Sequence, residues 1–230
     1  MSGSAVVLLS GGIDSATALA VAKSQGYDCY ALSVDYRQRH RFELRAAKKI
    51  ASALGVKRHR IIKMDLSAFG GSALTDSIAV PKFRPERRRS STIPVTYVPG
   101  RNMVLLALAL AWAETLEAGH IFIGVNAVDY SGYPDCRPEF IRAFQRAADL
   151  GTRVGAEGKP IRIHAPLIRM TKADIIRKGT SLGVPFRWTH SCYDPGPGGR
   201  ACGACDSCLI RKKGFTEAEI PDPTVYIGSG

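Results

Sequence analysis

The sequence predicts an α/β protein in which helices cover both faces of a doubly wound parallel sheet, followed by a small zinc-binding region. Three observations lead to this fold class. Strand-like and helix-like stretches alternate along most of the 230 residues, and the first apolar run ends in two glycines directly before a helical stretch. Cysteines gather near the C-terminal end, so we expect a nucleotide-binding unit at residues 1–185 and a metal-binding region at residues 186–230.

Each element follows from the spacing of its apolar residues and from the residues that end it. Apolar runs predict strands at residues 5–9, 28–34, 56–64, 120–125 and 161–164. Helical spacing predicts helices at residues 13–23, 41–54, 101–116, 138–150 and 171–182. Because the two kinds of element alternate, we expect parallel pairing with right-handed crossovers. The helix at 101–116 and the strand at 120–125 should extend the sheet on its other side.

Composition narrows the class of protein. With 45% hydrophobic residues the chain can bury one sizeable core. The longest apolar run, residues 103–113, is too short to span a bilayer, and the N-terminal run is not a signal peptide, so we predict a cytoplasmic protein. The net charge of +12 would suit nucleotides, phosphates or nucleic acid. Its densest run, residues 84–89, lies in a stretch at 70–94 that is better interpreted as a solvated loop.

The end of the first strand predicts a phosphate-binding turn. Gly11 and Gly12 allow backbone conformations that a side chain forbids, so successive N–H groups can converge on one oxyanion at the start of a helix. A tight turn without a ligand is the alternative for two glycines alone. Asp14 would repel a phosphate unless a cation lies between them, so we expect Mg²⁺. The residues assigned to nucleotide binding are Leu8, Leu9, Ser10, Gly11, Gly12, Ile13, Asp14, Ser15, Ala16, Thr17 and Ala18.

Two polar stretches that follow predicted strands are candidates for substrate binding. The first, after the second strand, lies where a doubly wound sheet holds its ligand, although any loop there contains exposed polar residues. The second, after the fourth strand, offers rings and carboxylates for a planar heterocycle with a guanine-like edge, and a rigid surface loop is the equal alternative. The residues are Asp35, Gln38, Arg39 and His40 in the first stretch, and Asp129, Tyr130, Tyr133, Asp135 and Arg137 in the second.

Two further side chains give weaker signals. Lys172 begins the last predicted helix and could meet a phosphate, which would place it with Asp14 and Ser15 in the catalytic group. Cys136 lies in the second polar stretch, but no paired histidine is evident, so a nucleophilic role is the less favoured interpretation.

The remaining cysteines predict a metal site. Cys192, Cys202, Cys205 and Cys208 can close a tetrahedron around Zn²⁺ and replace the core that this tail lacks. An iron–sulfur cluster is the competing interpretation, because ferredoxins also contain Cys-x-x-Cys-x-x-Cys. No Cys-Pro follows at the ferredoxin interval.

The motif Ser10-Gly11-Gly12-Ile13-Asp14-Ser15 resembles the PP-loop of the ATP pyrophosphatases, which release pyrophosphate while adenylating a substrate. Further motifs extend the resemblance, over nearly the whole chain, to the 7-cyano-7-deazaguanine synthase family. They are Asp35-Tyr36-x-Gln38-Arg39-His40, Val98-Pro99-Gly100-Arg101-Asn102, Gly124-Val125-Asn126, residues 129–137, Ser191-Cys192-Tyr193 and the final three cysteines.

The resemblance implies a Rossmann-like fold of the adenine nucleotide alpha hydrolase type and an ATP-dependent, ammonia-using ligase. Its substrate would be 7-carboxy-7-deazaguanine, converted through adenylated acid and amide to the nitrile for queuosine or archaeosine biosynthesis. The implied cofactors are ATP, also contacted by Arg101, with Mg²⁺ and one structural Zn²⁺ on the four cysteines. A homodimer without direct nucleic-acid contact is expected. The alternatives are a PP-loop enzyme that modifies a tRNA base directly and a non-enzymatic zinc module that binds nucleic acid.

Overall fold

The computed structural model describes residues 3–83, 93–128 and 132–228 of the chain. At its centre lies a parallel five-stranded sheet with the strand order β3-β2-β1-β4-β5. The strands are β1 (Ser4–Leu8), β2 (Asp28–Asp35), β3 (Arg58–Lys63), β4 (His120–Phe122) and β5 (Arg162–His164). The chain adds strands on one side of β1 and then on the other, so the predicted doubly wound sheet is confirmed.

The central position of β1 follows from its sequence. Its residues 5–8 are all apolar and at most 6% exposed, as expected of a parallel strand covered on both faces. Val6 pairs with Tyr30 of β2 on one side and with Ile121 of β4 on the other. The strand order reverses between β1 and β4, and such a switch point leaves a crevice at the carboxyl ends of the strands.

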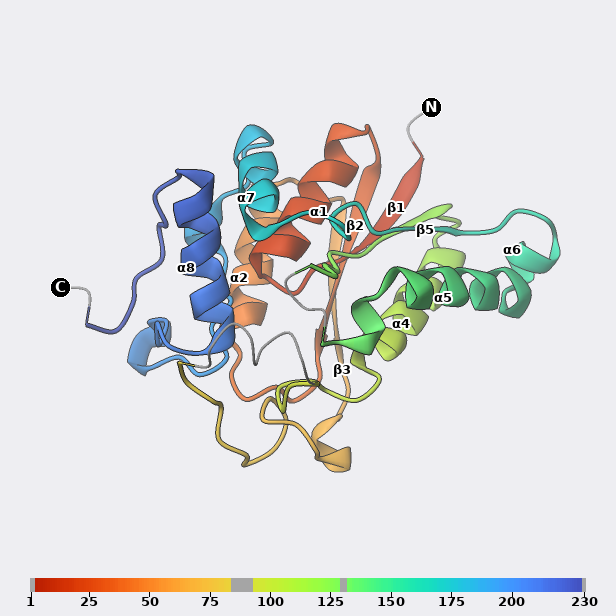
Figure 1. The fold of residues 1–230 in the computed structure, drawn as a ribbon. Coiled ribbons are helices and arrows are strands. Elements are labelled where there is room, and N and C mark those ends of the chain that lie inside the picture. The colour runs from red at the N-terminus through yellow and green to blue at the C-terminus, as the bar shows by residue number, and fades with distance from the viewer. Residues whose placement is uncertain (1–2, 84–92, 129–131, 229–230) are drawn as a thin grey trace.

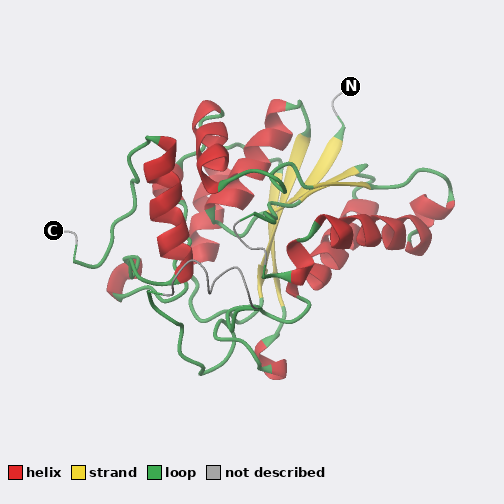
Figure 2. Ribbon diagram, viewed as in Figure 1, coloured by secondary structure: helices red, strands yellow, loops and turns green. Residues whose placement is uncertain are grey.

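Helices cover the two faces of the sheet as separate layers (Figure 1, Figure 2). One layer contains α1 (Ile13–Ser24), α2 (Phe42–Ala53) and α7 (Lys172–Ser181), and α8 (Asp206–Ala218) packs against α7. The other layer contains α4 (Arg101–Thr115) and α5 (Pro138–Gly151), which is followed by the short α6 (Arg153–Ala156). The alternation of side chains along β1 explains the two layers. Val7 packs into the core on the α1 side, whereas Val6 packs into the core on the α4 side.

The structure corrects the predicted elements mainly at their ends. The predicted strand at 120–125 ends at Phe122, although the N–H of Ile123 still donates to the carbonyl of His164 at 2.9 Å. Two helices, α6 and α8, lie outside the predicted set, because α6 is a single turn and α8 begins inside the cysteine motif, with Cys205 as its N-cap.

Among the helices of the described residues, none combines the length and the apolar composition that a membrane-spanning helix needs.

The cysteine-rich region packs on the main unit through α8. The rings of Phe186 and Phe215 meet edge to face at 5.5 Å. Gly214 of α8 lies so close to Lys172 of α7 that a Cβ at this glycine would overlap the lysine side chain. The division at residue 186 stays a prediction, and these contacts join the two sides of it.

Gly124 is predicted to be essential to the packing at the end of β4. A Cβ there would lie 2.8 Å from the carbonyl of Asp14 and from the backbone nitrogen of Ser15, whereas a Cβ at Gly119, before the same strand, would meet nothing within 4 Å. Gly124→Ala should therefore lower the free energy of unfolding by about 1–3 kcal/mol in urea titrations, and Gly119→Ala should change it by less than about 0.5 kcal/mol. Equal effects of the two substitutions would contradict this packing.

Candidate active site

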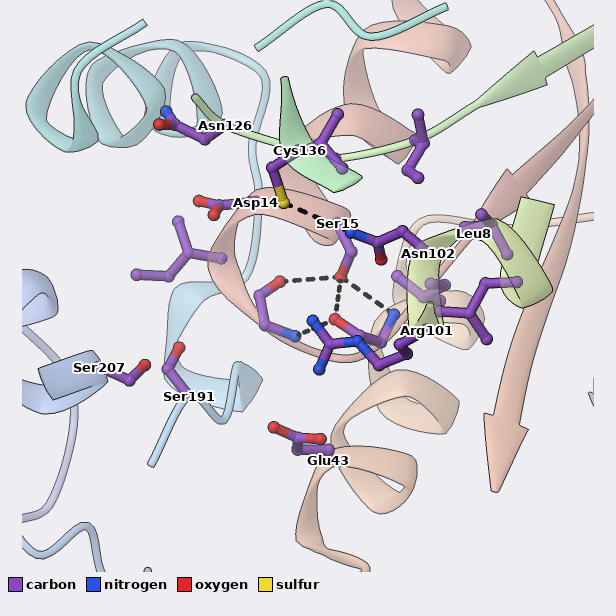
Figure 3. A pocket seen from close by; sticks show the side chains of 18 of the residues that line it. Leu8, Asp14, Ser15, Glu43, Arg101, Asn102, Asn126, Cys136, Ser191 and Ser207 are labelled. Atoms are coloured by element: carbon purple, nitrogen blue, oxygen red, sulfur yellow. Dashed lines mark hydrogen bonds between the residues drawn. The ribbon is translucent and has the colours of Figure 1, made fainter. Parts of the chain in front are cut away.

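A cavity opens at the carboxyl ends of the central strands, where the strand order reverses (Figure 3). The PP-loop forms one wall, and α2, α4, α7 and α8 contribute the others. Of the predicted nucleotide-binding residues, those that line the cavity are Leu8, Leu9, Ser10, Gly12, Ile13, Asp14, Ser15 and Arg101. Ala16, Thr17 and Ala18 are fully buried behind it in the core, and Gly11 packs away from it.

The hydroxyl of Ser15 holds the PP-loop in its turn (Figure 3). Its oxygen accepts hydrogen bonds from the backbone nitrogens of Ser10 and Gly11, both at 3.2 Å, and from the Ser10 hydroxyl at 3.0 Å. The same hydroxyl donates to the carbonyl of Gly12 at 3.1 Å. Ser15 therefore shapes the loop, and the first N–H groups of α1, which have no acceptor within the helix, remain for an anion.

Gly11 meets the requirement for glycine in the loop. Its φ of 95° lies in the left-handed region, and a Cβ would overlap the carbonyl oxygen of Glu43 and lie 2.8 Å from the nitrogen of Ala47. The first turn of α2 thus packs directly on the PP-loop.

Lys172 and Asp14 form a nearly buried ion pair at the base of the cavity. The ammonium nitrogen lies 2.6 and 2.7 Å from the two carboxylate oxygens, and the side chains are 6% and 17% exposed. The cation that the sequence analysis required beside Asp14 is therefore present within the chain itself. The carboxylate alone does not call for a metal ion.

Arg101 and Glu43 face the cavity from helices on opposite faces of the sheet (Figure 3). Arg101 begins α4, and its guanidinium contacts the hydroxyl of Tyr36 at 3.4 Å. Burial raises the pKa of the Glu43 carboxyl to about 7, and the positive charge of Arg101 opposes this rise. The sequence analysis did not select Glu43, which lies three residues beyond the polar stretch after β2.

Of the four candidates after β2, Gln38 lines the cavity and the other three make contacts around it. The Asp35 carboxylate accepts a hydrogen bond from the backbone nitrogen of Arg37 and pairs with Arg41. The guanidinium of Arg39 donates to the carbonyls of Ala73 and Ile78. His40 Nε2 lies 2.8 Å from the carbonyl oxygen of Cys192 and so connects this stretch to the cysteine cluster.

The candidate residues in the loop after β4 differ in whether they line the cavity. Tyr133 lines the cavity, and its hydroxyl lies 2.8 Å from that of Thr96. Asp135 is 5% exposed and accepts a hydrogen bond from the backbone nitrogen of Asn102 at 3.0 Å, so it caps the first turn of α4. Arg137 is exposed outside the cavity lining, and the assignments of Asp129 and Tyr130 lie outside the described residues.

Cys136 lines the cavity without the properties of a nucleophile. Burial raises the pKa of its thiol to about 12, and the Asn102 side chain donates to its sulfur at 3.3 Å. A thiol in this state stays protonated at neutral pH, so it packs against α4 as a small apolar group.

Cys192, Cys202, Cys205 and Cys208 converge on one point, as predicted. Their sulfur atoms all lie within 4.8 Å of one another, and those of Cys202 and Cys208 are 4.0 Å apart. A tetrahedron with metal–sulfur bonds of about 2.3 Å requires sulfur atoms about 3.8 Å apart, so the geometry fits one metal ion. Backbone nitrogens of Cys202 and Cys205 donate to sulfur atoms of the cluster at 3.2 and 3.3 Å.

Several cavity residues were missed because their chemistry is ordinary in isolation. Ser191 and Ser207 each precede a metal-site cysteine, and their hydroxyls face the cavity (Figure 3). In the sequence, their position beside Cys192 and Cys208 was the feature that could have indicated a place in the site. Other polar residues of the lining include Glu43, Asn102, Asn126, His190 and Arg211; Asn102, Asn126 and Ser191 belong to motifs already noted in the sequence.

The parallel sheet and the cavity above the glycine turn before α1 define a doubly wound α/β protein with its site at the carboxyl ends of the strands. The chain matches the family model of the queuosine biosynthesis protein QueC over residues 4–219. Relatives named 7-cyano-7-deazaguanine synthase are 66% identical in Anaeromyxobacter sp. (strain Fw109-5), with 97% of this chain and 96% of the relative covered, and 63% identical in Desulfatibacillum aliphaticivorans, with the same coverage.

The chain therefore belongs to the QueC family of queuosine biosynthesis proteins. A solved NMN synthetase from Francisella tularensis is similar in fold, with a TM-score of 0.50, 18% identity, and coverage of 96% of this chain and 79% of that one. This likeness concerns the fold alone.

The Asp14–Lys172 pair yields a prediction for both stability and ATP binding. Lys172→Met leaves a largely buried carboxylate uncompensated beside the anion-binding turn, so it should lower the free energy of unfolding by about 3–5 kcal/mol. ATP affinity should fall at least about tenfold, equivalent to about 1.4 kcal/mol. Lys178→Met, exposed on the same helix, is the matched control and should preserve both quantities. Unchanged calorimetric ATP affinity in Lys172→Met would contradict the assignment.

Proposed function

We propose that this chain is an ammonia-dependent ligase that converts 7-carboxy-7-deazaguanine to 7-cyano-7-deazaguanine in the cytoplasm, with consumption of ATP. The observation that carries the proposal is a single cavity shared by the PP-loop and the loop after β4. Because both loops line one cavity, the acid and later the amide could each react with ATP at the same place. The names of relatives at 63–66% identity support the same product.

The chemistry requires two activations, because a carboxylate and an amide are both inert toward loss of oxygen. In the first, the acid oxygen attacks the α-phosphorus of ATP, pyrophosphate leaves, and ammonia then displaces AMP to give the amide. In the second, the amide oxygen attacks another ATP, and loss of AMP and the nitrogen-bound protons gives the nitrile. Each activation needs the same stabilisation of departing pyrophosphate.

We assign that task to the PP-loop. The N–H groups at the start of α1 would bind phosphate oxygens, and the Lys172 ammonium would offset the charge that develops on them. When Mg²⁺ is bound with ATP, it would add positive charge at the phosphates, with Asp14 as the protein ligand that it shares with Lys172. Ser10 and Ser15 keep the turn in shape.

The substrate would lie between Tyr133 and the walls formed by α2 and α4. Tyr133 is held by Thr96, so its ring can cover a planar heterocycle. The carboxylate of Asp135 is engaged in capping α4, so Asp129 is our candidate for the guanine-like edge. A homodimer and the absence of direct nucleic-acid contact remain part of the proposal.

The reaction itself gives the first test. Purified protein supplied with 7-carboxy-7-deazaguanine, ATP and ammonium should form the nitrile, with two AMP and two pyrophosphate per nitrile and no ADP. The amide should be converted with one ATP. Mass spectrometry of the base and chromatography of the nucleotides measure these yields. If the free base gives no nitrile while tRNA stimulates AMP formation, direct modification of tRNA takes the place of this function.

We also propose that the four-cysteine site holds one structural Zn²⁺. Elemental analysis should give about one zinc per chain in a colourless preparation. Cys205→Ser should lower the melting temperature, because this region replaces apolar core with metal bonds, whereas Cys29→Ser changes a cysteine far from the site and should leave the zinc content unchanged. Iron with acid-labile sulfide would contradict the assignment.

A further inference from the structure

Glu43 is a half-buried acidic group for which the described part of the fold supplies no hydrogen-bond or ion-pair partner. It lies in the first turn of α2, and its carboxylate points into the cavity (Figure 3). Within the described part of the chain, no hydrogen bond or ion pair to this carboxylate is found, and Arg101 acts on it only through longer-range attraction. An acid held in this way is free to bind a small cation or to accept a proton.

Apart from Arg101, whose guanidinium contacts the hydroxyl of Tyr36, the other charged side chains around the cavity are paired within the protein. Lys172 contacts both oxygens of Asp14, and the Arg211 guanidinium is paired with Asp222 at 3.0 Å. Asp135 caps α4 and lies outside the cavity lining. Among the described residues that line the cavity, Glu43 is therefore the carboxylate that no protein group pairs with.

The position of Glu43 is fixed by the PP-loop. The backbone of Glu43 packs directly on Gly11, so the carboxylate is attached one short side chain away from the loop that would hold the phosphates of ATP. Its raised pKa, which burial causes, lets it exchange a proton near neutral pH. A proton acceptor for the bond-forming nitrogen needs both properties.

We propose that the Glu43 carboxylate binds the ammonium ion and accepts its proton, so that neutral ammonia attacks the acyl adenylate. This inference rests on the function proposed above. Ammonium has no lone pair, and at neutral pH it is the main form in solution, so a base close to the acyl carbon would generate the attacking form where it is needed.

The step balances in atoms and protons. Glu43 takes one proton from ammonium; the nitrogen lone pair forms the C–N bond; the C–O bond to the phosphate breaks; and AMP leaves with its electron pair. The second proton that the nitrogen loses passes to solvent. After the second adenylation the same carboxylate can accept the proton lost from nitrogen as AMP departs and the nitrile forms.

The groups that face Glu43 are consistent with this role. The guanidinium of Arg101 from α4 and the hydroxyl of Tyr36 from the end of β2 act on it electrostatically. The positive charge of Arg101 keeps the acid partly ionised. Asp14, Lys172 and His190 line the same cavity from other elements.

The test separates adenylation from attack by nitrogen. Glu43→Gln preserves the shape of the side chain and removes the base. Adenylation is measured as the exchange of labelled pyrophosphate into ATP in the presence of 7-carboxy-7-deazaguanine and the absence of ammonium, and this exchange should keep its wild-type rate. Amide formation with ammonium should fall by about 10²-fold or more. Hydroxylamine is largely unprotonated at neutral pH, and hydroxamate formation with it should fall at least about tenfold less.

Glu139→Gln is the matched control, because Glu139 occupies the same position in the first turn of α5 and is exposed. It should leave all three rates unchanged. If Glu43→Gln does not fold, Glu43→Asp, which withdraws the acid by one methylene, should show the same division with a smaller loss.

Three results would overturn the inference. Loss of pyrophosphate exchange with a raised KM for the acid would make Glu43 a substrate-binding residue instead. Equal losses with ammonium and hydroxylamine, or no loss with either, would also exclude the proton-accepting role. These results differ from failure of the proposed function, in which the wild-type protein itself shows no exchange dependent on the acid.

Discussion

The contact between Lys172 and Asp14 holds the site together. It joins the first turn of α1 to the first turn of α7, and the two paired residues lie 158 positions apart in the sequence. Gly214 of α8 leaves room for the stem of Lys172, and α8 begins directly after Cys205, a member of the four-cysteine cluster. A continuous path of packed groups therefore connects the four-cysteine cluster to the PP-loop. Loss of the cluster would reach the PP-loop through α8 and α7.

The cavity also depends on how buried charges are balanced. Arg211 is 2% exposed and is compensated by Asp222, which in turn accepts a hydrogen bond from the Tyr226 hydroxyl at 2.6 Å. Asp135 is offset by the start of α4, where it fixes the residue that follows Arg101. These buried charged side chains are therefore compensated within the protein, and Asp135 also positions the start of α4. The net charge of +12 arises largely from residues outside the cavity lining.

The sequence predicted the sheet and the PP-loop well, because both depend on local patterns. Continuous apolar strands and a Ser-Gly-Gly turn before a helix specify β1 and α1 with few alternatives. The roles of the acidic residues could not be predicted from the sequence, because they depend on contacts between distant parts of the chain. Asp135 and Glu43 are similar in the sequence, but the first caps a helix that starts more than thirty residues earlier, and only the tertiary packing makes the second a cavity residue. Gly124, two residues beyond the end of β4, closely approaches Asp14, and no local pattern contains this contact.

The most direct test of this account follows the oxygen atoms of the substrate. 7-Carboxy-7-deazaguanine labelled with ¹⁸O at both carboxylate oxygens should transfer one labelled oxygen to the AMP of the first activation and the other to the AMP of the second. Mass spectrometry should then find one ¹⁸O in each AMP and none in pyrophosphate. Unlabelled AMP, or label in pyrophosphate, would contradict adenylation of the acid and the amide at the PP-loop.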